Sequence, residues 1–161
     1  VRNMDKQQSV KENGKKEIGL KEIKETRGYI KVGAEIKNVI IDIEGGREVI
    51  GGIYFEGEMP IRVKIKAGEY RATIGQTLIY KPKGELEIEI EGEVVLQGSD
   101  ATFGPSSFGE RPCIIGDEVR VHIPHGSKLT MQGGRSLESA LKGAYNRASA
   151  IQVKTFTITQ E

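Results

Sequence analysis

Few side chains of this chain could do acid–base or metal chemistry. Its only histidines, His122 and His125, stand three positions apart where an expected strand meets a turn. A zinc site needs more nitrogen or sulfur ligands than this pair supplies, so we expect no metal and no other cofactor. Cys113, the only cysteine, sits beside Pro112 and Ile114 with no identifiable base as a partner. This setting is typical of a small buried apolar residue rather than of a nucleophile.

Four residues are candidates for binding a ligand. Arg71 and Arg120 suit paired hydrogen bonds to a phosphate, and the ring of Tyr70 can stack on a ligand ring. His122, close to Arg120 on the polar side of an expected strand, could help to bind an anion; the alternative is that both residues belong to a solvated face. The sequence assigns no catalytic residue, so whether the chain is an enzyme stays open.

Two expected strands carry rows of charged side chains. Basic residues occupy alternate positions at Arg62, Lys64 and Lys66, and they could bind phosphates. The acidic row lies further along the chain, at Glu85, Glu87, Glu89 and Glu91. We expect the two rows to pair across neighbouring strands, an arrangement that stabilises sheets. The acidic row is then a solvated face rather than a metal site.

Alternation of apolar and polar residues predicts strands between Tyr29 and Met131. Glycine-rich residues 44–47 predict a hairpin, and residues 81–84 and 124–127 predict two further turns. We find no internal repeat of 20–50 residues. The sequence therefore predicts an all-β fold, a jelly-roll or barrel.

Other elements are expected at the two ends and in one loop. Residues 1–27 form a polar N-terminal arm or a short helix from Lys15 to Thr26, and residues 28–161 form a single β-rich domain. Within it, a helix near 136–150 begins at Ser136, and a strand follows it. The loop 98–112 carries Phe103 and Phe108, which either give it a function or anchor it to the core.

Composition narrows the choice of partners. The 161 residues have a formal net charge of +1, so we expect neither nucleic acid nor a membrane surface as a partner. No apolar run reaches the length of a membrane span, and the first ten residues lack the apolar core of a signal peptide. With a single cysteine, a cytoplasmic location is expected. Abundant Lys and Glu lean toward a thermophile.

Residues 53–131 resemble the cupin superfamily. The stretch contains IYFEGE, AGEYRATIGQ, KGELEIEIEG and GDEVRVHIPHGSKLTM, and it is most similar to the small cupin-type pyrimidine/purine nucleoside phosphorylases. The resemblance implies a cupin-like jelly roll. The segment GQTLIYKPKGE lacks the His-x-His of metal-binding cupins, so the implied activity is metal-free. A second stretch, GEVVLQGSDATFG with GSKLTMQGG, is similar to the N-terminal β-sandwich of RNA 5′-hydroxyl polynucleotide kinases.

Three functions follow as alternatives. The first is a β-barrel that binds a nucleoside, sugar or phosphorylated compound, with phosphorolysis as the resemblance-led reaction. The second is a non-enzymatic coat, filament or scaffold subunit, a homo-oligomer that exchanges its N-terminal arm between copies. The third is an accessory β-sandwich domain in nucleic-acid processing. A polar, roomy interior would favour the first, and an interior filled with Ile, Val and Leu would leave only interaction roles.

Overall fold

The computed structural model describes residues 19–24, 28–43, 48–103, 107–137 and 146–161. These residues form the strands β1 (Leu20–Ile23), β2 (Tyr29–Val32), β3 (Asn38–Ile41), β4 (Gly52–Phe55), β5 (Ile61–Arg71), β6 (Ile79–Gln97), β7 (Ile114–Ile123), β8 (Lys128–Gln132) and β9 (Ile151–Gln160). The prediction of an all-β fold is confirmed.

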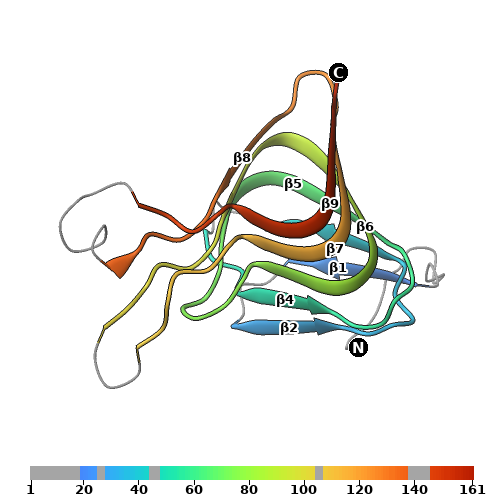
Figure 1. Cartoon of the computed structure of the whole chain (residues 1–161). Coiled ribbons are helices and arrows are strands. Elements are labelled where there is room, and N and C mark those ends of the chain that lie inside the picture. The colour runs from blue at the N-terminus through green and yellow to red at the C-terminus, as the bar shows by residue number, and fades with distance from the viewer. Residues whose placement is uncertain (1–18, 25–27, 44–47, 104–106, 138–145) are drawn as a thin grey trace.

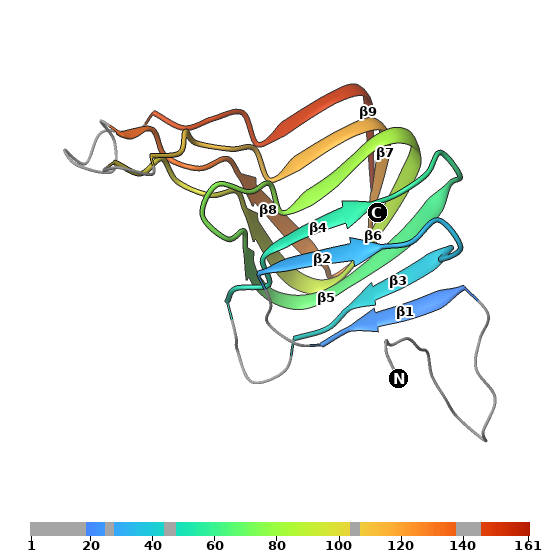
Figure 2. The ribbon, with the colours of Figure 1, turned by 90° about the horizontal axis from the view of Figure 1, so that it is seen from below.

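All pairings between these strands are parallel, and the strands wind in successive coils around one interior (Figures 1 and 2). Strands β3 and β4 do not pair with each other, so the expected hairpin at 44–47 is wrong. The expected turn at 124–127 is confirmed, because the Ser127 amide donates a hydrogen bond to the Pro124 carbonyl at 3.0 Å, but the turn joins β7 to β8 without pairing them. The turn residues themselves at 44–47 lie outside the described residues. A jelly roll consists of antiparallel strands, so the expected cupin-like barrel is not what these strands form. Their arrangement is that of a parallel β-solenoid.

Three faces make up each complete coil. The long face contains β1, β3, the first part of β5, the middle of β6 and most of β7 and β9. The tyrosine face contains β2, β4 and the first residues of β6, β7 and β9. The third face contains the ends of β5 and β6 together with β8. All three faces share the interior that the coils enclose.

Strand β6 contributes to all three faces because it bends at two corners. Gly84 and Gly92 stand at these corners with φ of +84° and +80°, a conformation that glycine adopts without steric cost. A β-carbon at Gly84 would lie 2.1 Å from the carbonyl oxygen of Glu58. The expected turn at residues 81–84 is therefore a corner inside one strand, where the pairing with β7 shifts register.

Inward-pointing side chains stack in columns from coil to coil. Ile61, Leu86 and Val119 occupy one column of the long face, and each is at most 5% exposed. The neighbouring columns and the other two faces complete a continuous aliphatic cluster. Among the described residues, Lys81 and Ser99 are the buried polar or charged ones. The interior is therefore a packed core, which agrees with the alternation read from the sequence.

The expected polar arm or helix is wrong over residues Leu20–Ile23. Leu20–Ile23, which the sequence analysis assigned to a polar arm or a helix, is strand β1, paired in parallel with β3. The side chain of Ile23 is 4% exposed because it stacks beneath Ile41, and this burial favours a strand over a helix. Residues 1–18 and 25–27 of the expected arm lie outside the described residues.

The helix expected near 136–150 does not extend to residue 150. Residues 138–145 lie outside the described part of the chain, and residues 146–150 are not helical. Arg147 instead forms an isolated antiparallel bridge with Arg135, and the Ala150 carbonyl accepts a hydrogen bond from the Cys113 amide. The strand expected after the helix is confirmed as β9.

Candidate functional site

Tyr70 lies inside the coil, so its ring does not face a ligand-accessible surface. Its side chain is 2% exposed, and its hydroxyl donates a hydrogen bond to the Lys66 carbonyl at 2.5 Å. The Ile41 carbonyl lies 3.4 Å from the same hydroxyl. Burial raises the pKa of Tyr70 to about 12. Tyr70 therefore packs the corner between the long face and the third face.

The other three predicted ligand residues point outward, and two of them share a face. Arg71 lies on the third face, 3.9 Å from Glu48. Arg120 and His122 lie on the long face in neighbouring columns. The structure therefore brings Arg120 and His122 together and separates them from Arg71 and Tyr70. Their role in binding a ligand remains a prediction.

Carboxylates surround the Arg120–His122 pair. The guanidinium of Arg120 forms ion pairs with Glu85 at 3.1 Å and with Glu118 at 3.4 Å. The His122 imidazole lies 3.5 Å from a carboxylate oxygen of Glu161. An anion binding here would displace these carboxylates from the arginine. The local charge thus opposes the anion site predicted for this pair.

The long face carries a ladder of alternating charge. Asn38, Arg62, Glu87, Arg120 and Thr157 stack in one outward column. Arg62 pairs with Glu87 at 3.3 Å in this ladder. The prediction that the basic and acidic rows pair across strands is confirmed, and it explains why these strands select one register.

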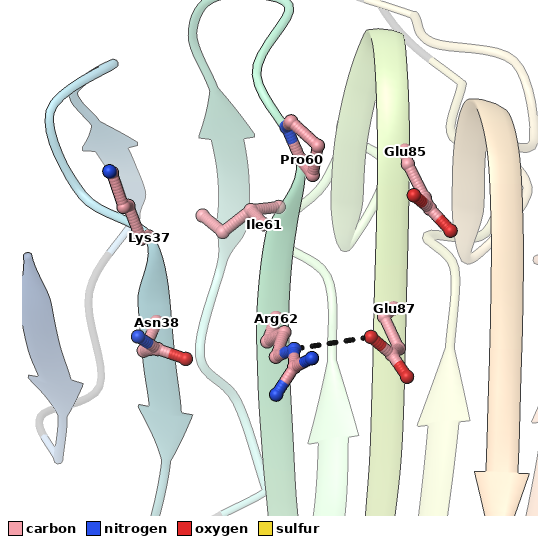
Figure 3. A pocket seen from close by; sticks show the side chains of 7 residues that line it. All are labelled: Lys37, Asn38, Pro60, Ile61, Arg62, Glu85 and Glu87. Carbon is pink, nitrogen blue, oxygen red and sulfur yellow. Dashed lines mark ion pairs between the residues drawn. The ribbon is translucent and has the colours of Figure 1, made fainter.

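A hollow of about 270 Å³ lies over the part of this ladder that contains Asn38, Arg62 and Glu87 (Figure 3). The ion pair of Arg62 with Glu87 crosses it, and the side chains of Lys37, Asn38 and Glu85 lie around it. Arg62, Glu85 and Glu87 already have partners in the Arg62–Glu87 and Glu85–Arg120 ion pairs. These paired groups offer little charge to a ligand, and Lys37 is the remaining charged side chain among the described residues that line the hollow.

Besides Tyr70, two titratable side chains of the described residues lie in the interior, those of Lys81 and Cys113. Lys81 is 1% exposed, and its ammonium group donates a hydrogen bond to the Gly57 carbonyl at 3.3 Å. Burial lowers the pKa of Lys81, and the charges of Asp117 and Glu58 partly oppose this shift. The sequence analysis missed Lys81, because nothing in the local pattern KPKG distinguishes an inward lysine from a solvated one.

Cys113 is buried as the sequence predicted. Its thiol donates a hydrogen bond to the Ala150 carbonyl at 3.0 Å, and burial raises its pKa to about 12. A thiol with that pKa is protonated at neutral pH and is a poor nucleophile. Among the described residues, no cluster of three or more His, Cys, Asp or Glu side chains could hold a metal ion. Within the same residues, no helix is long and apolar enough to cross a membrane.

The last strand of the solenoid has one free edge. Strand β9 pairs with β7 from Ile151 to Gln160 without a register shift, and no other described strand pairs with it. Its sequence, IQVKTFTITQ, contains a single charge, Lys154, and no proline. A long, regular and weakly charged edge strand is a template for pairing with another chain.

The inward row of β9 is also incompletely covered. Ile151, Val153 and Phe156 pack against the core cluster but are only half-buried, and Ile158 is 48% exposed. Val121, on which Ile158 stacks, is 1% exposed. The β9 end thus combines unpaired backbone groups with uncovered apolar side chains. The sequence showed the strand but gave no sign that one of its edges is unpaired among the described strands.

Comparisons of the chain with family models, curated proteins and solved structures found no match.

Proposed function

We propose that this chain is a non-enzymatic assembly protein whose copies join through the β9 end. The observation that carries the proposal is the exposure of Ile158 at 48% in the inward row of a strand with a free edge. In the preceding coil, the equivalent Val121 is fully covered. A second copy of the chain on β9 would cover this row and satisfy the backbone groups of the edge.

The packed interior supports an interaction role over an internal ligand site. A small-molecule site inside the coil would need a polar and roomy cavity, whereas the inward side chains of the described residues are almost all aliphatic. The expected binding of a nucleoside, sugar or phosphorylated compound stays a prediction. Phosphate release from a panel of nucleosides tests its phosphorylase version.

Assembly is tested by measuring the mass of the protein in solution. Light scattering coupled to size exclusion should show association that increases with protein concentration. Ile158→Lys should shift the equilibrium toward the monomer by at least tenfold in dissociation constant, because the new charge would be buried against the partner. Ile74→Lys is the matched control, since Ile74 is 60% exposed and lies in the loop between β5 and β6, neither of which pairs with β9. Monomers at every concentration would rule the proposal out.

Assembly through β9 can have two geometries, which differ in the mass and the shape of the particles. Pairing of β9 with β9 of a second copy gives a closed dimer, whereas stacking of β9 on the first coil of the next copy gives an open filament. Electron microscopy separates the two outcomes.

The arm-exchange form of assembly predicts a different sensitivity. Part of the expected arm, Leu20–Ile23, pairs within its own chain as β1, so only residues 1–18 remain for exchange. Deleting residues 1–18 should abolish assembly if an exchanged arm holds the subunits together. If β9 holds them together, the deletion should leave assembly intact while Ile158→Lys abolishes it.

A further inference from the structure

A second feature lies outside the coil, on the tyrosine face. A hollow of about 540 Å³, here called the tyrosine groove, is lined by Tyr29, Tyr54, Tyr80, Gln76, Thr77 and Arg111 together with glycine and isoleucine residues. Its size is within the range of ligand-binding clefts. None of the residues predicted from the sequence to bind a ligand lies in it.

The floor of the groove is aromatic. Tyr54 of β4 and Tyr80 of β6 occupy the same outward column, with ring centroids 5.5 Å apart and planes inclined by 33°. Tyr29 and Tyr80 are 56% and 39% exposed. The two stacked rings are too close to admit a flat ligand between them, so a ligand ring would lie across their outer surface.

Hydrogen bonds hold the polar rim in place. The Gly52 amide donates to Gln76 Oε1 at 2.9 Å. A β-carbon at Gly52 would lie 2.4 Å from that oxygen, so glycine is what allows the Gln76 side chain to approach the strand. The hydroxyl groups of Thr77 and the tyrosines add both donors and acceptors around the groove.

Among the described residues that line the groove, Arg111 is the one with a charged side chain. It comes from the long loop 98–112, which the sequence analysis marked as a candidate functional loop. Its guanidinium forms no ion pair or hydrogen bond with another residue in the described part of the chain, unlike the guanidinium groups of Arg62 and Arg120. An exposed, unpaired guanidinium beside an aromatic floor suits a ligand that carries a carboxylate.

The same loop places a phenyl ring close to the groove. The ring of Phe108 packs over Gly75, at a distance that leaves no room for a side chain there: a β-carbon on Gly75 would lie 2.8 Å from the ring. Phe103 is 69% exposed and does not anchor the loop to the core. The anchoring alternative for the loop is thus wrong for Phe103, while the contact of Phe108 fixes the loop beside the groove.

We propose that the tyrosine groove binds an acidic saccharide, with a sugar ring packed on Tyr54 and Tyr80 and its carboxylate on Arg111. The apolar face of a pyranose ring packs on an aromatic ring, and its hydroxyl groups require the mixed donors and acceptors that the rim provides. Single-stranded nucleic acid is disfavoured because it needs several cations along its backbone, and the groove has one. A proline-rich peptide would use the aromatic floor but not the charge of Arg111.

Calorimetric titration with a tetramer of galacturonic acid tests the proposal, with a neutral tetrasaccharide as the comparison ligand. The acidic tetramer should bind at least tenfold more tightly than the neutral one. Tyr80→Ala should weaken both by roughly tenfold through the lost stacking. Arg111→Gln should remove the preference for the acidic ligand, whereas the control Arg71→Gln should leave it unchanged, because Arg71 lies on the third face beside Glu48.

Folding of each variant is checked by its thermal melting, and Ile158→Lys keeps the groove intact while removing the β9 contact. Retained binding by that variant would show that the groove acts independently of assembly. Equal affinity for the acidic and neutral tetramers would overturn the proposal. So would tighter binding of a proline-rich peptide or of single-stranded DNA, or an absence of binding at millimolar saccharide.

Discussion

Strands β7 and β9 are paired neighbours with the same alternating sequence pattern, but their inward side chains differ in exposure. Both alternate apolar and polar residues, and their residues lie opposite one another from Ile114 and Ile151 onward. In β7, the inward Val121 is 1% exposed, whereas Ile158, stacked on it from β9, is 48% exposed. Strand β7 has a strand on each side, but β9 has one neighbour among the described strands.

This difference shows that burial in the solenoid comes from the adjacent coils rather than from the strand itself. Each coil covers one side of the next, so stability is close to a sum of contacts between neighbours. The last coil has half of these contacts. The equivalent apolar rows therefore differ: the row of β7 is part of the packed core, and the row of β9 is partly exposed.

The largest expected difference is in the response to truncated side chains. Ile88→Ala removes a side chain that is 1% exposed and should lower the free energy of unfolding by about 2–5 kcal/mol. Ile158→Ala should lower it by less than about 1 kcal/mol, since half of that side chain is already in water. Urea denaturation of dilute protein measures both values. Equal losses would mean that β9 is covered in the monomer.

The response to alkaline pH also distinguishes the interior from the terminal strand. Burial raises the pKa values of Tyr70 and Cys113 to about 12, above those of the same groups in the unfolded chain. Their stabilising contribution is therefore complete below the unfolded pKa values and decreases as the pH rises toward 12.

For Tyr70 alone, this loss should reach about 2 kcal/mol between pH 10 and 12. Unfolding measured across this range tests it, and Tyr70→Phe should flatten the decline. The inward residues of β9 contribute nothing to this decline, because none of them is ionisable. An unchanged loss of stability in the Tyr70→Phe variant would show that Tyr70 does not cause it.

The strands were largely predictable, but their pairing was not. Alternation such as GELEIEIEG identifies a strand with one buried side whether its neighbour is parallel or antiparallel. The glycines at 45 and 46 suggested a hairpin, and the glycine at position 84 suggested a turn, because glycine favours tight turns. In the structure, Gly84 instead allows β6 to bend around a corner. Local sequence therefore records the bend but not where the next strand pairs.

The repeat of the solenoid was hidden by unequal loops. The stacked residues Asn38, Arg62, Glu87, Arg120 and Thr157 are separated by different lengths of chain, so no fixed period appears in the sequence. The charge pairing across strands was predicted because it depends on residue type alone. The tyrosine groove was missed because Tyr54 and Tyr80 meet only through the coil register.

A smaller change in the free energy of unfolding is expected when the buried charge of Lys81 is removed. Lys81→Met should leave the free energy of unfolding unchanged or raise it by about 1 kcal/mol at pH 7, because the lowered pKa of Lys81 means that folding disfavours its charged form. The matched control is Lys83→Met at an exposed position two residues away, which should have almost no effect. A loss of more than about 2 kcal/mol in Lys81→Met would show that the hydrogen bond to Gly57 outweighs the cost of burial.

The smallest expected difference is in the coupling free energy of two ion pairs, one in the charge ladder and one on β9. Arg62 and Glu87 lie 3.3 Å apart, and the ladder continues with Arg120 above Glu87. Lys154 of β9 lies 3.9 Å from Asp117, and its side chain is 83% exposed. Double-mutant cycles should give a coupling of roughly 0.5 kcal/mol for the first pair and close to zero for the second.

Both couplings should decrease in 1 M salt, because exposed charges are screened. Assembly through β9 would alter only the second pair, since Lys154 lies on the strand that the partner would cover. A coupling for Lys154 and Asp117 that increases with protein concentration would therefore report the partner directly. An equally large coupling for this pair in dilute monomer would mean that the end of the solenoid is as ordered as its middle, and it would remove the contrast between β7 and β9.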